Sequence, residues 1–226
     1  MSKQDEQETI EIDPLHPHLI LCEGKDAYNF IVNFLDETEK IYKDFFNFYV
    51  YDFKGIKQLT KYILNFIKQD SFDIVKSITI IRDAERDAIA ACSSIKESLR
   101  KAGLSVPQTP CTPVKDINSD FPDIATGFVL FPTCSNEIAN GTLEDLCLNI
   151  LDREDSSSIL HDIDKALEPY KSNLSRIHKN RLHAFFSFTN EYVSLKIGEA
   201  ARCKAFSYDG PEMTSLKKFL VEILEK

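Results

Sequence analysis

The chain has 226 residues, of which 43% are hydrophobic and 28% are charged, and its formal net charge is −9. This length allows one large domain, or a core domain with a smaller appendage. The acidic balance argues against tight, sequence-independent binding of nucleic acid by the chain alone, because phosphate binding normally needs a basic face. No apolar run is long enough to cross a membrane, so no membrane partner is expected.

The first half of the sequence alternates between strand and helix patterns. Residues 1–16 lack the basic start and the apolar centre of a signal peptide, so we expect a flexible cytoplasmic tail. Short apolar runs then predict buried strands, and apolar residues at a 3.6-residue period predict helices between them. Strands are expected at 18–22, 48–53 and 78–81, and helices at 25–39, 55–67 and 85–101.

The second half changes in character. Four prolines interrupt residues 103–126, which predicts a long loop with at most one edge strand. A fourth strand is expected at 127–131, and helices at 142–151, 159–170, 176–188, 191–202 and 213–225. This order predicts an α/β fold with a mainly parallel sheet flanked by helices. We expect the α/β domain at 17–151 and a helical C-terminal extension, packed on the same core, at 152–226.

Acidic residues gather where the first and third predicted strands end. Glu23 and Asp26 follow the first strand, and Asp83, Glu85 and Asp87 follow the third. In parallel sheets the carboxyl ends of the strands lie at one edge, and ligands bind there. We expect the first and third strands to be adjacent, so that Glu23 faces Asp83 and Glu85. Carboxylates that converge at such an edge repel one another unless a cation or protons neutralise them. The pattern favours a divalent-metal site over helix capping, which explains one such acid more easily than a whole group.

These acids lie in motifs that resemble those of the toprim domain, which occurs in topoisomerases, bacterial primases, recombination-mediator proteins, ribosomal RNA maturases and OLD-family nucleases. The motifs are Leu21-Cys22-Glu23-Gly24-Lys25-Asp26 and Ile81-Arg82-Asp83-Ala84-Glu85. A later Gly141-Thr142-Leu143-Glu144-Asp145-Leu146 segment and the C-terminal helices are similar to a small stand-alone family of microbial toprim-like proteins. The resemblance implies a toprim-like fold over about residues 17–225, with Glu85 where the family usually has aspartate.

The resemblance also implies a role for each acid. Glu23 would act as general acid or base and contact the metal, and Asp83 and Glu85 would hold Mg²⁺ or Mn²⁺. Asp26 would join a second metal by resemblance to OLD-type nucleases, and Asp87 belongs to the same group of candidate ligands. Two metals about 4 Å apart would stabilise both the attacking and the leaving oxygen in phosphodiester cleavage.

The start of the helix at 142–151 offers one more candidate ligand. Glu144 lies there, and this helix begins at the same edge of the sheet as the other acids. The neighbouring Asp145 is fully explained by a capping box with Thr142, which makes it a structural residue.

Candidate phosphate-binding residues lie at two places. Gly24 and Lys25 would present a backbone amide and an ammonium group to a phosphate at the start of a helix, and Lys25 is counted with Glu23 as catalytic. The alternative is a tight turn at Gly24 and a solvated Lys25. Lys179 and His183, one helical turn apart, would form a basic strip for phosphate or a solvated helix face.

Taken together, the sequence favours a cytoplasmic, metal-dependent protein that acts on phosphodiester bonds, with a DNA or RNA nuclease component as the leading hypothesis. Its expected partners are nucleic acid and an ATPase or nucleic-acid-processing protein, and a homodimer is left open. The alternative is a catalytically inert toprim-like interaction module that works with a partner protein. Glu85 in place of aspartate and the acidic surface favour this alternative. A third option is phosphotransfer or phosphohydrolase activity on a small nucleotide.

Overall fold

The computed structural model of the protein describes residues 11–153 and 157–226, so residues 1–10 of the predicted tail lie outside the described residues. The strands are β1 (His18–Cys22), β2 (Phe48–Asp52), β3 (Ser77–Asp83) and β4 (Ala125–Phe131). The α-helices are α1 (Lys25–Thr38), α2 (Leu59–Ile67), α3 (Ala88–Lys101), α4 (Leu143–Arg153), α5 (Ser157–Leu167), α6 (Ile177–Ser187), α7 (Ile197–Arg202) and α8 (Pro211–Leu224). In this described part of the chain, no helix combines the length and the hydrophobicity needed to cross a membrane.

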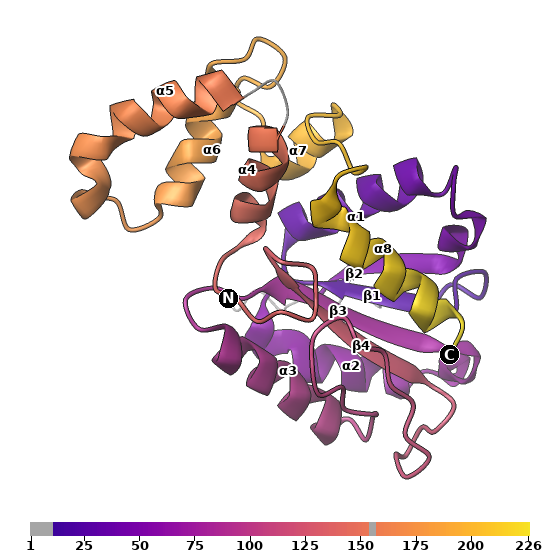
Figure 1. Cartoon of the computed structure of the whole chain (residues 1–226). Helices are drawn as coiled ribbons and strands as arrows, with labels where there is room; N and C mark the ends of the chain where they lie inside the picture. The colour runs from indigo at the N-terminus through magenta and orange to yellow at the C-terminus, as the bar shows by residue number, and fades with distance from the viewer. Residues whose placement is uncertain (1–10, 154–156) are drawn as a thin grey trace, which may run out of the picture.

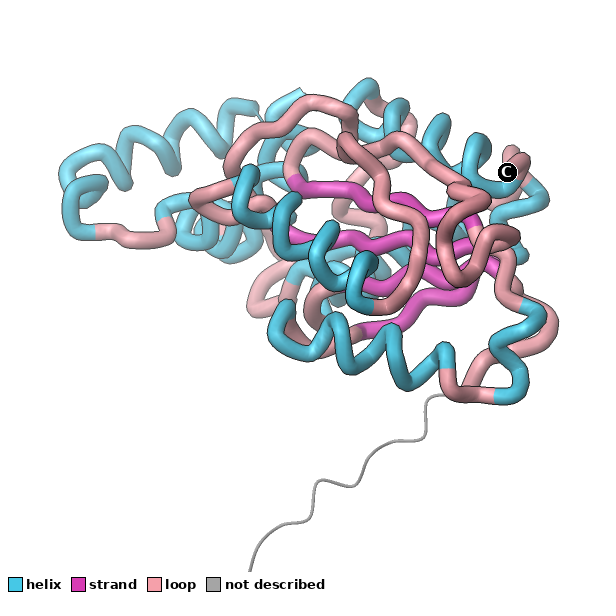
Figure 2. The backbone as a smooth tube through the Cα atoms, turned by 90° about the horizontal axis from the view of Figure 1, so that it is seen from below, coloured by secondary structure: helices cyan, strands magenta, loops and turns pink. Residues whose placement is uncertain are grey.

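The strands form one parallel sheet in the order β2-β1-β3-β4. Helices α2 and α3 lie against one face, and α1 and α8 lie against the other (Figure 1). A view turned by 90° shows the strands between these helical layers (Figure 2). The architecture is the predicted α/β fold with a parallel sheet flanked by helices.

Burial on both faces explains the apolar sequences of the strands. In β1 and β3, which read HLILC and SITIIRD, every residue is buried except the terminal Asp83. Side chains along a strand alternate between the two faces. Ile20 and Ile81 therefore pack on the α1–α8 side, and Leu21 and Ile80 pack on the α2–α3 side.

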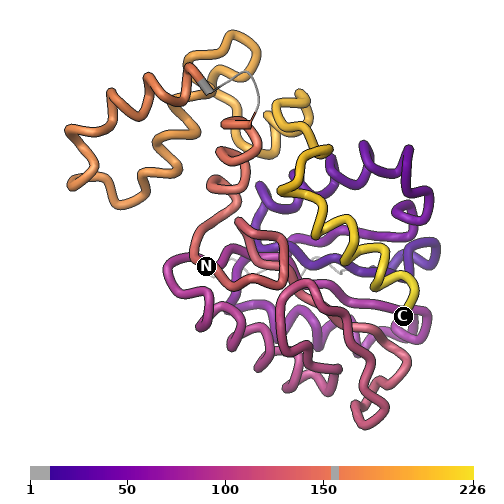
Figure 3. Tube along the Cα trace, viewed as in Figure 1, coloured from indigo at the N-terminus to yellow at the C-terminus, as the bar shows by residue number. Residues whose placement is uncertain are grey.

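The C-terminal helix returns to the sheet that the first half of the chain builds (Figure 3). Helix α8 packs on β4, where its Phe219 and Ile223 lie over Gly127. Helix α7 packs on α1, whereas α5 and α6 pack on each other and on α4 and project from the sheet (Figure 1). The helices after α4 thus include a part that covers the sheet and a part that extends away from it.

Replacing Gly127 with alanine is expected to lower the free energy of unfolding by about 1–3 kcal/mol, as overpacking of a core typically does. A Cβ atom at this buried position would lie 2.4 Å from Cζ of Phe219. Urea denaturation measures the loss, and adding Phe219→Leu to the variant should recover part of it. Equal stability of Gly127→Ala and wild type would show that α8 does not pack closely on β4.

Several predicted boundaries differ from the structure. The helix predicted at 55–67 is α-helical only from Leu59, because Ile56–Gln58 form a 3₁₀ helix. Helix α3 begins at Ala88 and not at residue 85, because Glu85 has a φ of 56° and pairs through its backbone with Gly141. Strand β4 begins two residues earlier than predicted, because the ladder with β3 extends that far. Helix α7 begins at Ile197, since residues 190–194 form a turn in which Ser194 has a φ of 66°.

Candidate functional site

The acidic residues lie where the sheet topology forms a crevice. The connection that follows β1 runs over one face of the sheet, and the connection that follows β3 runs over the other. Ligands of open α/β sheets bind outside the carboxyl ends of the strands at such a switch point. Strands β1 and β3 are neighbours, as predicted, and Glu23 and Asp83 lie at their ends.

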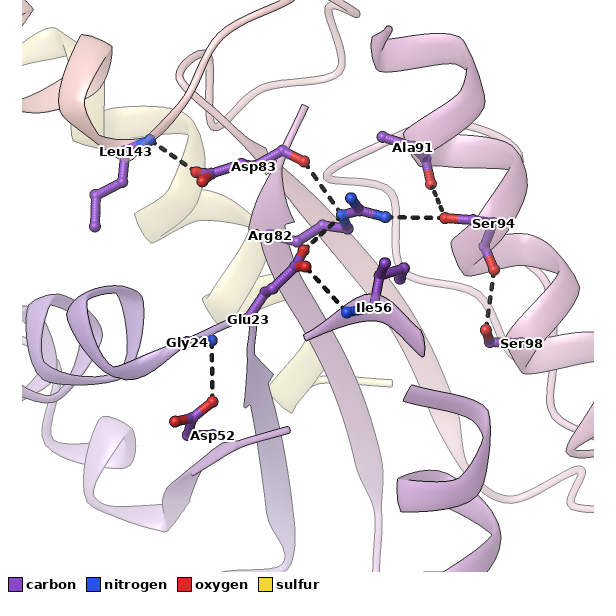
Figure 4. Close-up of polar contacts among 10 residues, drawn as sticks. All are labelled: Glu23, Gly24, Asp52, Ile56, Arg82, Asp83, Ala91, Ser94, Ser98 and Leu143. Carbon is purple, nitrogen blue, oxygen red and sulfur yellow. Dashed lines mark hydrogen bonds and ion pairs between the residues drawn. The ribbon is translucent and has the colours of Figure 1, made fainter. Parts of the chain in front are cut away.

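The strand register sets Glu23 beside Arg82 and not opposite Asp83. Cys22 pairs with Ile81, and the N–H of Glu23 donates to the carbonyl of Ile81 (3.0 Å). Because side chains alternate along β3, Arg82 and Asp83 point to opposite faces of the sheet (Figure 4). The expectation that Glu23 faces Asp83 directly is therefore wrong.

Arg82 forms an ion pair with Glu23, with 2.9 Å between Nε and Oε2. Its Nε also donates to the backbone carbonyl of Asp83 (3.2 Å), and its Nη1 donates to Oγ of Ser94 on α3 (2.9 Å). The other oxygen of Glu23, Oε1, accepts from the N–H of Ile56 (3.0 Å) at the start of the 3₁₀ helix η2 (Ile56–Gln58). Arg82 is only 7% exposed. Removing either side chain of this pair would leave the charge of the other without compensation, which is strongly destabilising.

Among the acidic residues of the crevice, Asp83 has the pKa that differs most from its ordinary value. Burial raises its pKa to about 7, and the negative charges of Glu144, Glu85 and Glu23 act in the same direction. The hydrogen bond that Oδ1 accepts from the N–H of Leu143 (2.8 Å), at the start of α4, opposes this shift. Asp83 forms no ion pair with another residue of the described chain, so its charge is left unbalanced there.

Glu144 lies in the first turn of α4 and is buried, but it has a counter-charge. Nζ of Lys179, on α6, lies 2.8 Å from Oε1 of Glu144. Burial opposes ionisation of Glu144, but the hydrogen bonds from Lys179 and Thr142 outweigh it and lower the pKa. One half of the predicted capping box is present, because the N–H and Oγ1 of Thr142 both donate to Oδ2 of Asp145 (2.8 and 3.0 Å), whereas the N–H of Asp145 donates to the carbonyl of Thr142.

The remaining candidate metal ligands are Asp26, Asp87 and Glu85. Oδ1 of Asp26 accepts from the N–H of Gly198 in α7 (3.3 Å). Asp87 is the N-cap of α3, where its Oδ1 accepts from the N–H of Ala90 (2.9 Å). The side chain of Glu85 is exposed at the rim. The structure thus gives Asp26 and Asp87 contacts that stabilise the fold.

The candidate phosphate-binding residues are also spread out. Gly24 has a φ of 90°, which favours glycine, and its N–H donates to Oδ1 of Asp52 (3.0 Å). Lys25 is exposed at the start of α1, with Nζ 4.7 Å from the ring centre of Tyr28. His183 is exposed on α6, one turn after the lysine that pairs with Glu144. Lys25 is therefore the accessible cation of the first motif.

The carboxylate oxygens of the crevice are suitable ligands for a divalent cation, but they are not arranged to enclose one. Within residues 11–153 and 157–226, no three or more His, Cys, Asp or Glu side chains form a group that could hold a metal ion. The register accounts for this, because it turns Glu23 and Asp83 to different sides of the sheet edge. Mg²⁺ is usually held by one or two carboxylates together with substrate phosphates. The residues fit a cation shared with a ligand better than one enclosed by protein alone.

Sequence reasoning missed Arg82, although it lies within the second motif. A signal was available, since arginine is almost never fully buried without a partner. An arginine near the end of an apolar strand, beside a neighbouring strand that ends in glutamate, indicates a buried ion pair. Ser94 carries no comparable signal, because its role depends on how α3 packs against the sheet.

Comparison with known proteins identifies a family. The model of a family described as "Protein of unknown function (DUF3226)" matches residues 17–225. No curated protein and no solved structure matches the chain. The matched range includes the sheet, the crevice and the helices through α8.

Proposed function

We propose that this chain, which belongs to the DUF3226 family of proteins of unknown function, is a toprim-like protein that binds Mg²⁺ or Mn²⁺ and acts on phosphodiester bonds. We favour a DNA or RNA nuclease component that works with an ATPase or another nucleic-acid-processing protein. The observation that carries this proposal is the position of Asp83, a half-buried carboxylate whose pKa is raised to about 7, at the switch point where β1 and β3 end side by side.

The balance of charge supports a cation in the crevice. Arg82 neutralises Glu23, and Lys179 neutralises Glu144. Above pH 7 the ionised Asp83 adds a negative charge that has no ion-pair partner among the described residues. A divalent cation would remove this excess of negative charge.

The chain's own residues would divide the chemistry among them. Asp83 would hold the cation together with phosphate oxygens of the ligand, and the bound cation would stabilise charge on those oxygens. Glu23 would give or take the proton of the leaving or attacking oxygen. Lys25, exposed beside the crevice, would contact the phosphate as a point charge.

A calorimetric titration with Mn²⁺ at pH 8, with and without dimethyl phosphate, tests the cation site. Wild type should bind Mn²⁺ saturably, and Asp83→Asn should bind it at least about tenfold more weakly, because asparagine lacks the charge. Asparagine retains an oxygen that accepts from Leu143. The matched control is Asp162→Asn on the exposed surface of α5, which should bind like wild type. A folded wild type without Mn²⁺ binding under either condition would contradict the proposal.

A second candidate function is a catalytically inert toprim-like interaction module. The two ion pairs favour it, because Arg82 and Lys179 neutralise two carboxylates with groups from the chain itself. Catalysis and affinity for nucleic acid would then come from a partner protein. A folded wild type that binds no Mn²⁺ and cleaves neither DNA nor RNA would favour this candidate over the first.

A further inference from the structure

A pocket separate from the crevice lies where the end of α1 meets the segment between α7 and α8. Its volume is about 380 Å³, which is within the usual range of small-molecule sites. Helix α1 begins at the crevice edge of the sheet, and the pocket adjoins its other end at Glu37 and Thr38. Because α1 has 14 residues, its two ends lie about 20 Å apart. The pocket is therefore distinct from the site of the proposed function.

Three lysines line this pocket, which we call the lysine pocket. Lys40 follows α1, Lys204 lies between α7 and α8, and Lys217 lies on α8. Two acids, Glu37 and Asp209, also line it, so three positive and two negative side chains leave a net charge of +1. The whole chain has a net charge of −9, so the lysine pocket is a local concentration of positive charge.

Lys217 is the most enclosed of the three cations. Its side chain is 15% exposed, whereas Lys40 and Lys204 are exposed. Among the described residues its one ion pair is with Asp209, with 3.5 Å between Nζ and Oδ1. The side chain of Asp209 is 86% exposed, so water weakens this pair. An enclosed ammonium group with a partner that lies largely in water is poorly compensated, and an anion in the pocket would compensate it better.

The lysine pocket also has apolar walls. Ile41 lines it and is 69% exposed, and the buried Phe206 forms another part of the wall. Small-molecule sites typically combine apolar walls with a few charged or polar groups that orient the ligand. The lysine pocket therefore has surface for the organic part of a ligand as well as ammonium groups for an anionic part.

We propose that the lysine pocket binds a small organic phosphate monoester, with Lys217 as the residue that fixes the phosphate. A phosphate monoester carries a charge of about −1.5 to −2 at pH 7, so it suits several converging ammonium groups better than a carboxylate does. Its organic part lies against Ile41 and Phe206. The site uses no residue of the crevice and no metal, so it is independent of the proposed function.

Asp209 and the ligand compete for Lys217. Removing the charge of Asp209 should therefore strengthen the binding of a phosphate monoester, and removing the charge of Lys217 should weaken it. A lysine that only stabilises the fold would not give these opposite effects.

The experiment is a calorimetric titration with phenyl phosphate, without divalent metal, on wild type, Lys217→Gln, Asp209→Asn and Lys218→Gln. Lys218 is the matched control, because it follows Lys217 on α8 but is exposed and does not line the pocket. Lys217→Gln should bind phenyl phosphate at least about tenfold more weakly than wild type, because it loses a charged hydrogen-bond donor. Asp209→Asn should bind it about two- to fivefold more tightly, and Lys218→Gln should bind like wild type.

Two further probes test which part of the ligand is recognised. Benzyl alcohol has the ring without the charge, and benzoate has a single charge, so both should bind wild type more weakly than phenyl phosphate. Circular dichroism checks that each variant is folded. If Lys217→Gln does not fold, the tighter binding expected of Asp209→Asn still tests the proposal, because Asp209 is exposed.

Three results would overturn the proposal. These are a folded wild type that does not bind phenyl phosphate, equal binding by folded Lys217→Gln and Lys218→Gln, and binding of benzyl alcohol or benzoate as tight as that of phenyl phosphate. None of them bears on Mn²⁺ binding at the crevice, which is measured separately.

Discussion

Under the proposed function, replacing Glu23 with glutamine is expected to slow metal-dependent phosphodiester cleavage by about 10²–10⁴-fold, the usual effect of losing a general acid or base. The carboxylate is fixed at the switch point by the N–H of Ile56 and by Arg82. Glutamine retains an oxygen that accepts from Ile56, but it has no charge and no proton to exchange. Initial rates with Mn²⁺ on labelled single-stranded DNA, duplex DNA and RNA measure the effect.

The matched control for this substitution is Glu97→Gln. Glu97 forms an exposed ion pair with Arg100 on α3, so its loss leaves the crevice unchanged. The control should cleave at the wild-type rate, and thermal unfolding should show that Glu23→Gln is folded. Cleavage by Glu23→Gln at the wild-type rate would remove this residue from the mechanism.

Replacing Asp83 with asparagine should stabilise the fold increasingly as the pH rises. Burial raises the pKa of Asp83 from 3.8 to about 7, so the folded protein holds this proton more tightly than the unfolded chain. This tighter proton binding stabilises the folded protein fully below about pH 4, and the stabilisation is lost as the pH rises from about 4 to 7. It amounts to at most about 4 kcal/mol. Asparagine does not ionise and avoids this loss, while an oxygen remains for the N–H of Leu143.

Urea denaturation of wild type and Asp83→Asn between pH 4 and 8 measures this effect. The free-energy difference between the two proteins should grow with pH and level off above pH 7. Saturating Mn²⁺ should reduce the difference at pH 8, because a cation that binds Asp83 stabilises only the wild type. Asp162→Asn on α5 is the control and should show no such slope. A difference that does not change with pH would show that Asp83 ionises normally in the folded protein.

The sequence suffices to predict the parallel sheet and the edge where the acids gather. Buried strands such as HLILC read as apolar runs, and the helices between them have a clear period. The register cannot be predicted in this way. A shift of one residue between β1 and β3 would turn every side chain to the other face, and nothing local to either strand selects Cys22 opposite Ile81. The pairing of Glu23 with Arg82 therefore becomes visible only in the structure.

The contact that Lys179 makes could not be predicted from the sequence either, because it joins residues that are far apart in the chain. Its spacing on α6 indicates a basic strip, but its ammonium group neutralises the buried Glu144 on α4. The two residues meet because α6 packs back against α4, and the packing of one helix on another is not encoded in the period of either. Sequence reasoning thus identified both side chains and missed their contact.

The return of α8 to the sheet has a consequence for synthesis on the ribosome. The strands emerge early, but the apolar surface of β4 is covered only when Phe219 and its neighbours on α8 have been made. A nascent chain that ends before α8 exposes this surface, which gives chaperones a binding site and gives other nascent chains a place to associate. The core of this protein therefore closes late, after nearly all of the described chain has left the ribosome.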